Sequence, residues 1–322
     1  MPLAHHQTII QAAEKFGIDP SVLTHLRDSA NAIYEFTQAE KPYILRLTPS
    51  SARNVDMIHA EMDFIDYLSQ NQAHVAHPQC SLAGNLVEAA GDGKYRMYAS
   101  VFEQAPGIHP ENEAITNEVM RMVGQALGQM HRLSKAYQPP GARRPHWHEI
   151  DVFQLVPEIP EDQVLVRQRC VDMLAHLHTL PVDDDSYGLI HGDPEPYNYL
   201  LHDGQLTFID FDDSCYHWYA FDVAVAVQYL EICANLEGKR VEPQQVWDQF
   251  YAGYRQENQL SDFWLDQMPM FMRLRVMEDY AFSEMAWDMD NLEDWQPGVL
   301  AWQRQAIEEA LEILDVDFHH HL

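Results

Sequence analysis

HGDPEPYN at residues 191–198 and IDFD at residues 209–212 carry most of the functional information in this sequence. Asp193 and Asn198 lie five residues apart, and Asp210 follows twelve residues later. Short apolar runs at 188–191, 198–201 and 205–210 predict strands, with HDG at 202–204 as a tight hairpin turn. A hairpin at this place would bring one amide and two carboxylates together.

These residue types suit phosphoryl transfer from a nucleotide. That reaction needs a carboxylate to accept the proton of the incoming hydroxyl and hard oxygen ligands for Mg²⁺. An ordinary turn could explain HGD, and an ordinary edge strand could explain IDFD. The two motifs in this order, on a strand–turn–strand pattern, favour the catalytic interpretation.

The two halves of the chain have different patterns. Residues 32–36, 42–47, 85–89 and 94–102 predict strands, and apolar residues at three- and four-residue spacing predict a helix over 52–70, capped by 49–51. After 105–107 the chain is mostly helical, with patterns over 113–135, 161–179, 219–236, 242–258, 262–290 and 300–314. The sequence therefore predicts an α+β fold of two domains, residues 1–104 and 105–322, with a ligand-binding cleft between lobes.

HGDPEPYN and IDFD resemble the HGDxxxxN loop and the I-D-[FW]-[DE] strand of the aminoglycoside phosphotransferase and choline kinase family, distant relatives of the protein kinases. The resemblance covers about residues 20–300. It implies a protein-kinase-like bilobal fold, with a small antiparallel sheet lobe containing one helix and a larger helical lobe. It implies Asp193 as catalytic base and Asn198 and Asp210 as Mg²⁺ ligands, with Asp212 assisting at the metal.

Two further residues of this region receive supporting roles from the same resemblance. His191 would brace the catalytic loop by hydrogen bonds. Asp222, on the next helix, would accept hydrogen bonds from backbone N–H groups of that loop.

The N-terminal half fits the same family. Arg46 would contact the α- and β-phosphates of ATP, and Glu61 would orient it by an ion pair; the alternative for Arg46 is a surface position on a strand. The loop that should cover the phosphates, within residues 27–34, contains no glycine, so Ser29 and the Asn31 backbone would substitute. The adenine edge would meet backbone groups from Phe102 to Gln104.

The acceptor is not identified by these motifs. Residues 276–303 contain seven acidic residues, no Lys or Arg, and interleaved aromatic residues, a composition that suits a substrate ammonium group or else a plain solvated surface. Arg273 and Arg275 just before this segment could instead bind a carboxylate or phosphate, or pair with neighbouring acids. The His-rich segment 145–149 lacks the further ligands of a metal site and is assigned to a loop.

The amino-acid composition limits the classes of partner that this protein can bind. The chain has 322 residues, with 20 Lys+Arg against 50 Asp+Glu, a formal charge of −30. This surplus argues against nucleic acid and against anionic membrane surfaces. Four scattered cysteines, the N-terminal residues and the short apolar runs predict a cytoplasmic protein. The oligomeric state is not predicted.

The sequence thus predicts a kinase that uses ATP and Mg²⁺ to phosphorylate a hydroxyl group of a small molecule, such as a cationic amino alcohol or aminoglycoside. A Ser/Thr protein kinase of the same fold is one alternative, which the eleven residues between Asp210 and Asp222 disfavour. A nucleotide-binding regulator without turnover is the other, and the complete set of Asp193, Asn198 and Asp210 argues against it.

Overall fold

The computed structural model describes residues 3–110, 115–150, 156–235 and 241–320. Contacts divide the chain into two compact units. The first unit comprises Met1–His109, Ala136–Arg144 and Asn198–Asp212, and the second comprises Pro110–Lys135, Pro145–Tyr197 and Asp213–Leu322. The hairpin region 198–212 is therefore grouped with the N-terminal segment, and the division at residue 104 stays a prediction.

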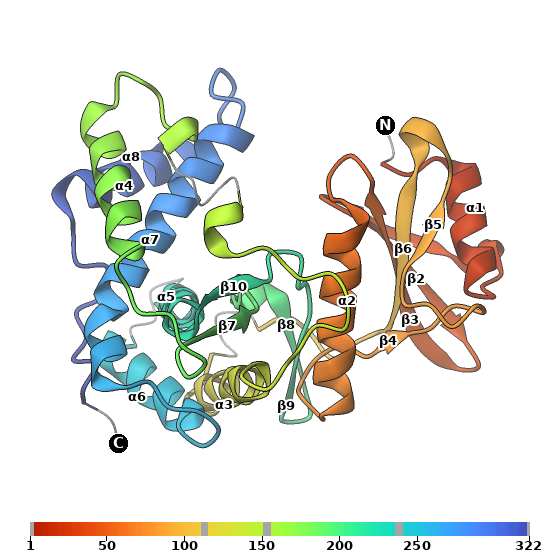
Figure 1. Cartoon of the computed structure of the whole chain (residues 1–322), viewed down its shortest axis with the longest axis horizontal. Helices are drawn as coiled ribbons and strands as arrows, with labels where there is room; N and C mark the ends of the chain where they lie inside the picture. Colours follow the sequence, from red (N-terminus) through yellow and green to blue (C-terminus); the bar gives the residue numbers. More distant parts are fainter. Residues whose placement is uncertain (1–2, 111–114, 151–155, 236–240, 321–322) are drawn as a thin grey trace. The chain divides into compact units, whose positions relative to one another are not determined.

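The first unit is built on an antiparallel sheet (Figure 1). Its strand order is β1-β2-β3-β6-β4, and β5 also pairs with β6. The strands are β1 (Thr24–Asp28), β2 (Ala32–Gln38), β3 (Lys41–Pro49), β4 (Pro78–Gln79), β5 (Glu88–Ala90) and β6 (Met97–Glu103). In this register Arg46 on β3 lies opposite Ile33 on β2 and Ser100 on β6.

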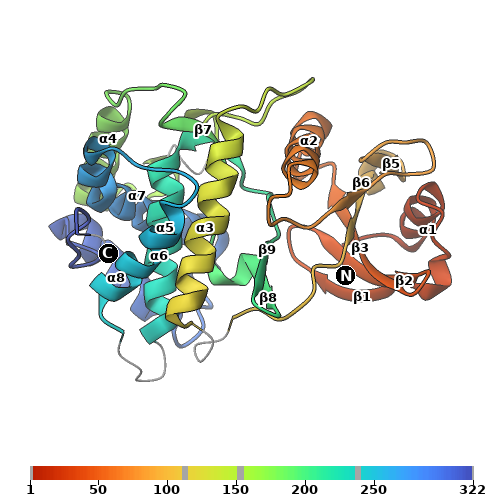
Figure 2. The ribbon, with the colours of Figure 1, turned by 90° about the horizontal axis from the view of Figure 1, so that it is seen from below.

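Successive side chains of a strand point to opposite faces of the sheet, and the residues on one face form its hydrophobic core. Tyr34 and Phe36 on β2 and Leu45 and Leu47 on β3 are buried in one hydrophobic cluster with residues of helix α1 (His6–Lys15). Helix α2 (Val55–Gln70) lies on the opposite face from α1 (Figures 1 and 2). The sheet thus has an apolar face under α1 and a face toward α2 that includes Arg46.

Two helices of this unit bear on the sequence predictions. Helix α2 confirms the helix predicted over 52–70, but its N-cap is Asn54, whose side chain accepts a hydrogen bond from the Met57 N–H. The expectation of one helix in this lobe was wrong, because α1 is also present. Its buried residues are Thr8, Ala12 and Ala13, and its two large apolar residues, Ile9 and Ile10, are partly buried.

A hairpin completes the first unit. It consists of β8 (Tyr199–His202) and β9 (Gln205–Phe208), joined by a turn at residues 203–204. Bridges pair Ile108 with Leu201 and Val75 with Phe208. These bridges attach the hairpin to the N-terminal segment although more than 90 residues separate Ile108 from Leu201 in sequence.

The second unit is mainly helical. It contains α3 (Asn117–Ser134), α4 (Val164–Leu177), α5 (Tyr219–Asn235), α6 (Pro243–Tyr254), α7 (Asp262–Ala286) and α8 (Gln296–Glu309). A two-stranded antiparallel pair, β7 (Tyr187–Ile190) and β10 (Cys215–Trp218), flanks the catalytic-loop motif. Figure 2 shows α3 and α5 alongside α6. The α+β fold class is confirmed, and no helix in the described residues is long and apolar enough to cross a membrane.

Candidate active site

A cavity of about 310 Å³ lies in the first unit. Its lining includes all five residues that the sequence predicts for nucleotide binding, together with the predicted metal ligand Asp210: Ser29, Arg46, Glu61, Phe102, Gln104 and Asp210. Three separate segments contribute them, namely the sheet, helix α2 and the residues after β9. The structure therefore brings together residues that are up to 181 positions apart in sequence.

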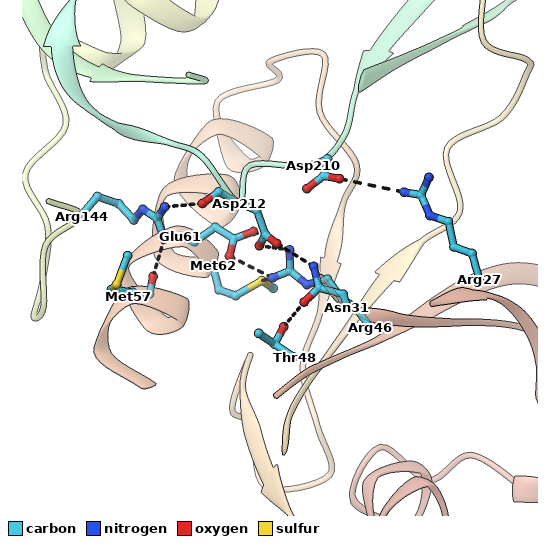
Figure 3. A network of polar contacts seen from close by, with 10 residues as sticks. All are labelled: Arg27, Asn31, Arg46, Thr48, Met57, Glu61, Met62, Arg144, Asp210 and Asp212. Carbon is cyan, nitrogen blue, oxygen red and sulfur yellow. Dashed lines mark hydrogen bonds and ion pairs between the residues drawn. The ribbon is translucent and has the colours of Figure 1, made fainter. Parts of the chain in front are cut away.

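Two arginines, Arg27 and Arg46, line this cavity, and Arg46 is almost fully buried, with 6% of its surface exposed. Its Nη1 donates to Glu61 Oε1 at 2.6 Å and its Nη2 donates to Glu61 Oε2 at 3.0 Å, a bidentate pair (Figure 3). Burial opposes the charged form of Arg46, but Glu61 and Asp212 outweigh it and raise its pKa above the usual value. The surface-strand alternative for Arg46 is excluded by its burial.

Asp212 uses both carboxylate oxygens within the same network. Oδ1 accepts from Arg46 Nη1 at 3.2 Å, and Oδ2 accepts from Asn31 Nδ2 at 2.6 Å. Burial opposes its ionisation, but Arg46, Arg53 and the Asn31 hydrogen bond together keep the pKa of Asp212 below its usual value. Arg144 donates to the backbone carbonyl of Asp212. Both oxygens of Asp212 therefore have partners within the protein, and its predicted assisting role at the metal stays a prediction.

Phe102 and its neighbours form the end of β6 beside the cavity. The Phe102 ring lies 5.3 Å from the Arg46 guanidinium carbon, a cation–π contact. The backbone N–H of Glu103 donates to His77 O at 2.8 Å, and that of Gln104 donates to Pro42 O at 3.1 Å. Both N–H groups are thus engaged within the protein, a feature that the sequence does not reveal.

Two of the three residues predicted at the metal, Asn198 and Asp210, flank the β8–β9 hairpin. Asn198 precedes β8 and Asp210 follows β9, and the Ile209 N–H donates to Asn198 O at 2.9 Å. Asp210 adopts a left-handed φ of 62°, and its carboxylate lies 3.9 Å from Arg27 Nη2. Mg²⁺ prefers carboxylate and amide oxygens and often takes one or two protein ligands plus substrate phosphates, so this donor set fits it. No group of three or more His, Cys, Asp or Glu arranged for a metal occurs among the described residues.

Asp193 lies in the second unit and is held by α7. Arg275 Nη2 donates to Asp193 Oδ1 at 2.7 Å, and Arg275 Nε lies 3.0 Å from Asp279 Oδ1. The Arg275 guanidinium carbon also lies 5.2 Å from the centroid of the Tyr229 ring. Arg275 therefore pairs with acidic residues, one of the alternatives open from the sequence. Burial lowers the pKa of Arg273, against the effect of Glu312.

Two further carboxyl groups, those of Glu195 and Glu278, interact with the cluster of Asp193, Arg275 and Asp279. Burial, together with repulsion from Asp193, raises the pKa of Glu195 to about 7. Burial raises the pKa of Glu278 well above its usual value, and Glu278 Oε1 is buried with no hydrogen-bond partner. Burial also raises the pKa of Asp279, against the effect of Arg275. The sequence motifs did not single out Glu195, and its position two residues after Asp193 was the available signal.

Asp222 is fully buried behind the catalytic loop. Its Oδ2 accepts from the His191 N–H and its Oδ1 from the Gly192 N–H, both at 2.9 Å, as expected from the sequence. His131 Nε2 lies 3.0 Å from Asp222 Oδ2, and His131 Nδ1 lies 2.9 Å from the Tyr254 hydroxyl. His131 was missed, because nothing in its local sequence distinguishes it from a core residue of α3.

The acidic and aromatic segment after Arg275 is divided between two environments. Glu278 and Asp279 belong to the Asp193 cluster, whereas Asp288, Asp290, Glu293 and Asp294 are exposed on the connection from α7 to α8. Trp287 and Trp295 pack edge to face there, with ring centroids 5.3 Å apart. Only the first part of the segment therefore lies with the predicted catalytic base.

Comparison with known proteins identifies relatives over most of the chain. Residues 22–260 match the family described as "Phosphotransferase enzyme family". Amicoumacin kinase of Bacillus subtilis (strain 168) is 31% identical over 317 residues, which cover 97% of this chain and 94% of that protein. An uncharacterised protein of Deinococcus radiodurans is 25% identical over 276 residues, covering 82% of this chain and 78% of its own.

Solved structures show the same fold. An amicoumacin kinase, hAmiN, in complex with AMP-PNP, Ca²⁺ and Ami matches with a TM-score of 0.89 and 33% identity, covering 96% of this chain and 94% of that one. A microcompartment-associated aminopropanol kinase matches with a TM-score of 0.74 and 22% identity over 93% and 95% of the two chains. Spectinomycin phosphotransferase with ADP and spectinomycin has a TM-score of 0.61 at 17% identity, over 98% of this chain and 100% of its own. The last two establish likeness of fold alone, and together the three confirm the kinase-like architecture.

Proposed function

Because this chain belongs to the phosphotransferase enzyme family of small-molecule kinases, we propose that it transfers the γ-phosphoryl group of ATP to a hydroxyl group of a small molecule that carries an amine. ATP and a divalent cation are typical cofactors of this family, and its relatives have been solved with AMP-PNP and Ca²⁺ or with ADP. The observation that carries the proposal is the cavity where Arg46, Glu61 and Asp210 lie with the end of β6.

Within the first unit, the side chains that line the cavity would hold the nucleotide. Arg46, fixed by Glu61, would place positive charge beside the α- and β-phosphates, and the cavity between Phe102 and Phe208 would accept the base. Asn198 and Asp210 would hold Mg²⁺, which neutralises charge on the β- and γ-phosphate oxygens. Asp212 would act through Arg46 and Asn31 rather than on the metal.

Within the second unit, Asp193 would act as the base. The acceptor oxygen forms a bond to the γ-phosphorus, the bond from that phosphorus to the β-bridging oxygen breaks, and ADP leaves. The hydroxyl proton passes to Asp193, whose orientation Arg275 maintains. One proton and one phosphoryl group move, and no oxidant or further reactant is needed.

The amine preference rests on the charge around Asp193. With all four carboxyl groups ionised, Asp193, Glu195, Glu278 and Asp279 would carry −4 against +1 on Arg275, a net −3. Burial resists that state and keeps Glu195 and Glu278 protonated to higher pH. A substrate ammonium group would supply the missing positive charge. Amicoumacin, the substrate named for the relative at 31% identity, is the first acceptor to test.

The test is ADP release with Mg-ATP against amicoumacin, aminoglycosides, aminopropanol, choline, ethanolamine, homoserine, methylthioribose and a generic protein substrate. Asp193→Asn should abolish turnover and retain nucleotide binding, whereas the control Asp203→Asn, on a side chain 90% exposed in the β8–β9 turn, should behave as wild type. Turnover only with methylthioribose, which carries no amine, would overturn the amine-site account, and turnover only with protein would favour the protein kinase alternative. Failure to bind Mg-ATP would refute the kinase proposal.

A further inference from the structure

The glycine-free loop between β1 and β2 lies beside the nucleotide cavity. It consists of residues 29–31, and Ser29 and Asn31 both line the cavity. The Ser29 N–H donates to the Asn31 carbonyl at 3.0 Å, which closes a tight turn. None of the three residues has a positive φ. The turn therefore does not need the left-handed conformation for which glycine is usually required.

The Asn31 side chain is anchored at both ends of its amide. Nδ2 donates to Asp212 Oδ2 at 2.6 Å, and Oδ1 accepts from the Thr48 hydroxyl at 2.7 Å. Asn31 is only 5% exposed and Thr48 2%. The amide orientation is determined by chemistry, because an ionised carboxylate only accepts hydrogen bonds and so must face the NH₂ group. The three side chains lie together in Figure 3.

Asp212 connects this anchor to Arg46, the buried arginine of the cavity. Its Oδ1 accepts from Arg46 Nη1 while Oδ2 accepts from Asn31. The loop and the guanidinium group are thus joined through one buried carboxylate. A shift of Asn31 would move Asp212 and, with it, one of the contacts that orient Arg46.

We propose that Asn31 is a positioning residue for the nucleotide phosphates: its side-chain amide holds the loop and, through Asp212, Arg46 in a phosphate-binding arrangement, in place of a glycine-rich loop. The inference rests on the proposed function, since it assumes that this cavity takes ATP. It predicts that Asn31 affects the part of the affinity contributed by the phosphates, and leaves recognition of the nucleoside unchanged.

Asn31→Asp is the sharpest variant, because it keeps the size of the side chain but places a second carboxylate against Asp212. The affinities for Mg-ATP and for adenosine are measured by calorimetry on the full chain. We expect the affinity for Mg-ATP to fall 10- to 100-fold while that for adenosine changes less than twofold. In turnover assays the KM for ATP should rise with kcat within about threefold of wild type.

The controls separate a positioning role from a general loss of structure. Asn117→Asp makes the same chemical change at an exposed position at the start of α3, and both affinities should remain at wild-type values. Thr48→Val removes one of the two anchors and should lower Mg-ATP affinity by about two- to fivefold, which keeps the proposal testable if Asn31→Asp fails to fold. The Thr48→Val and Asn31→Ala changes should be less than additive when combined.

The outcomes distinguish a failure of the role proposed for Asn31 from a failure of the kinase proposal. Wild-type Mg-ATP affinity in folded Asn31→Asp, or equal losses for Mg-ATP and adenosine, would overturn the inference and leave the kinase proposal standing. If the wild-type protein binds neither ligand, the kinase proposal fails and the inference fails with it.

Discussion

Arg275 on α7 donates a 2.7 Å hydrogen bond to Oδ1 of Asp193, 82 residues earlier in the chain. Both side chains are mostly shielded from solvent, at 15% and 18% exposure. The proposed base is therefore held from outside its own loop, by a guanidinium group that also pairs with Asp279.

Replacing Arg275 by Lys should lower kcat. Lysine keeps the charge but lacks the planar fork that reaches Asp193 and Asp279 together, so the base would lose its fixed orientation. We expect kcat to fall about 10- to 100-fold with the KM for ATP nearly unchanged, measured by steady-state kinetics. Arg273→Lys, two positions earlier on the same helix, is the matched control and should leave kcat unaltered. A comparable loss in both variants would contradict the assignment.

Replacing Asp222 by Ala should strongly destabilise the second unit. The change leaves the buried N–H groups of His191 and Gly192 without their acceptor, and it removes one of the two partners of His131. The expected loss in the free energy of unfolding is about 3–5 kcal/mol, measured by urea denaturation. Asp185→Ala, at a side chain 95% exposed, should stay within about 0.5 kcal/mol of wild type. Equal losses of unfolding free energy at both positions would show that the hydrogen bonds to Asp222 do not stabilise the protein.

Glu195 predicts a specific dependence of stability on pH. Its pKa in the folded protein is about 7, above the 4.5 of the free side chain, so folding favours its protonated form. Its contribution to stability is therefore full below pH 4.5 and is lost as the pH rises toward 7. Glu195→Gln cannot ionise, so between pH 4.5 and 7 its free energy of unfolding should rise relative to that of the wild type by about 3 kcal/mol, followed by urea denaturation at a series of pH values. Parallel curves for the two proteins would show that Glu195 ionises normally.

Gly192 should not tolerate a side chain. Its φ is +90°, and a Cβ atom there would lie 2.3 Å from the Asp213 carbonyl oxygen. Gly192→Ala should abolish turnover and lower the unfolding free energy by more than about 2 kcal/mol. Gly204→Ala in the β8–β9 turn shares a positive φ of 72° but meets no atom within 4 Å, so it should cost only about 1 kcal/mol. Thermal denaturation and the ADP-release assay measure both effects, and equal costs would exclude the close approach as the cause.

The sequence allowed much of the fold to be predicted where chemistry and spacing are local. The strand–hairpin pattern around HGDPEPYN and IDFD identified the family resemblance, and with it the pairing of Arg46 with Glu61, which the structure contains. The contacts that sequence reasoning missed join residues far apart in the chain. Asn31 and Asp212 are 181 residues apart, and Arg275 is one of several cations that could have faced the acidic segment. No local pattern predicts such pairs, because tertiary packing decides which side chains meet.

Helix α1 illustrates a second reason why some features were not predicted from the sequence. Its buried residues Thr8, Ala12 and Ala13 are small, and Ile9 and Ile10 are followed at three- and four-residue spacing only by Ala12, Ala13 and Glu14, so no repeat of large apolar residues marks the helix. The raised pKa of Glu195 was equally hidden, since it depends on burial and on Asp193 rather than on the residue type. The metal ligands Asn198 and Asp210 and the base Asp193 remain predictions, and Asp193→Asn tests the last of them.

The buried carboxylate of Asp222 also determines how the catalytic loop exchanges hydrogen with water. Loop amides usually exchange quickly, because small local openings expose them to solvent. The amide hydrogens of His191 and Gly192 are bonded to a side chain with no exposed surface, which His131 and Tyr254 enclose from α3 and α6. Those hydrogens can be released only when the helices themselves separate. The segment that precedes the proposed base Asp193 should therefore be among the last parts of this protein to take up deuterium.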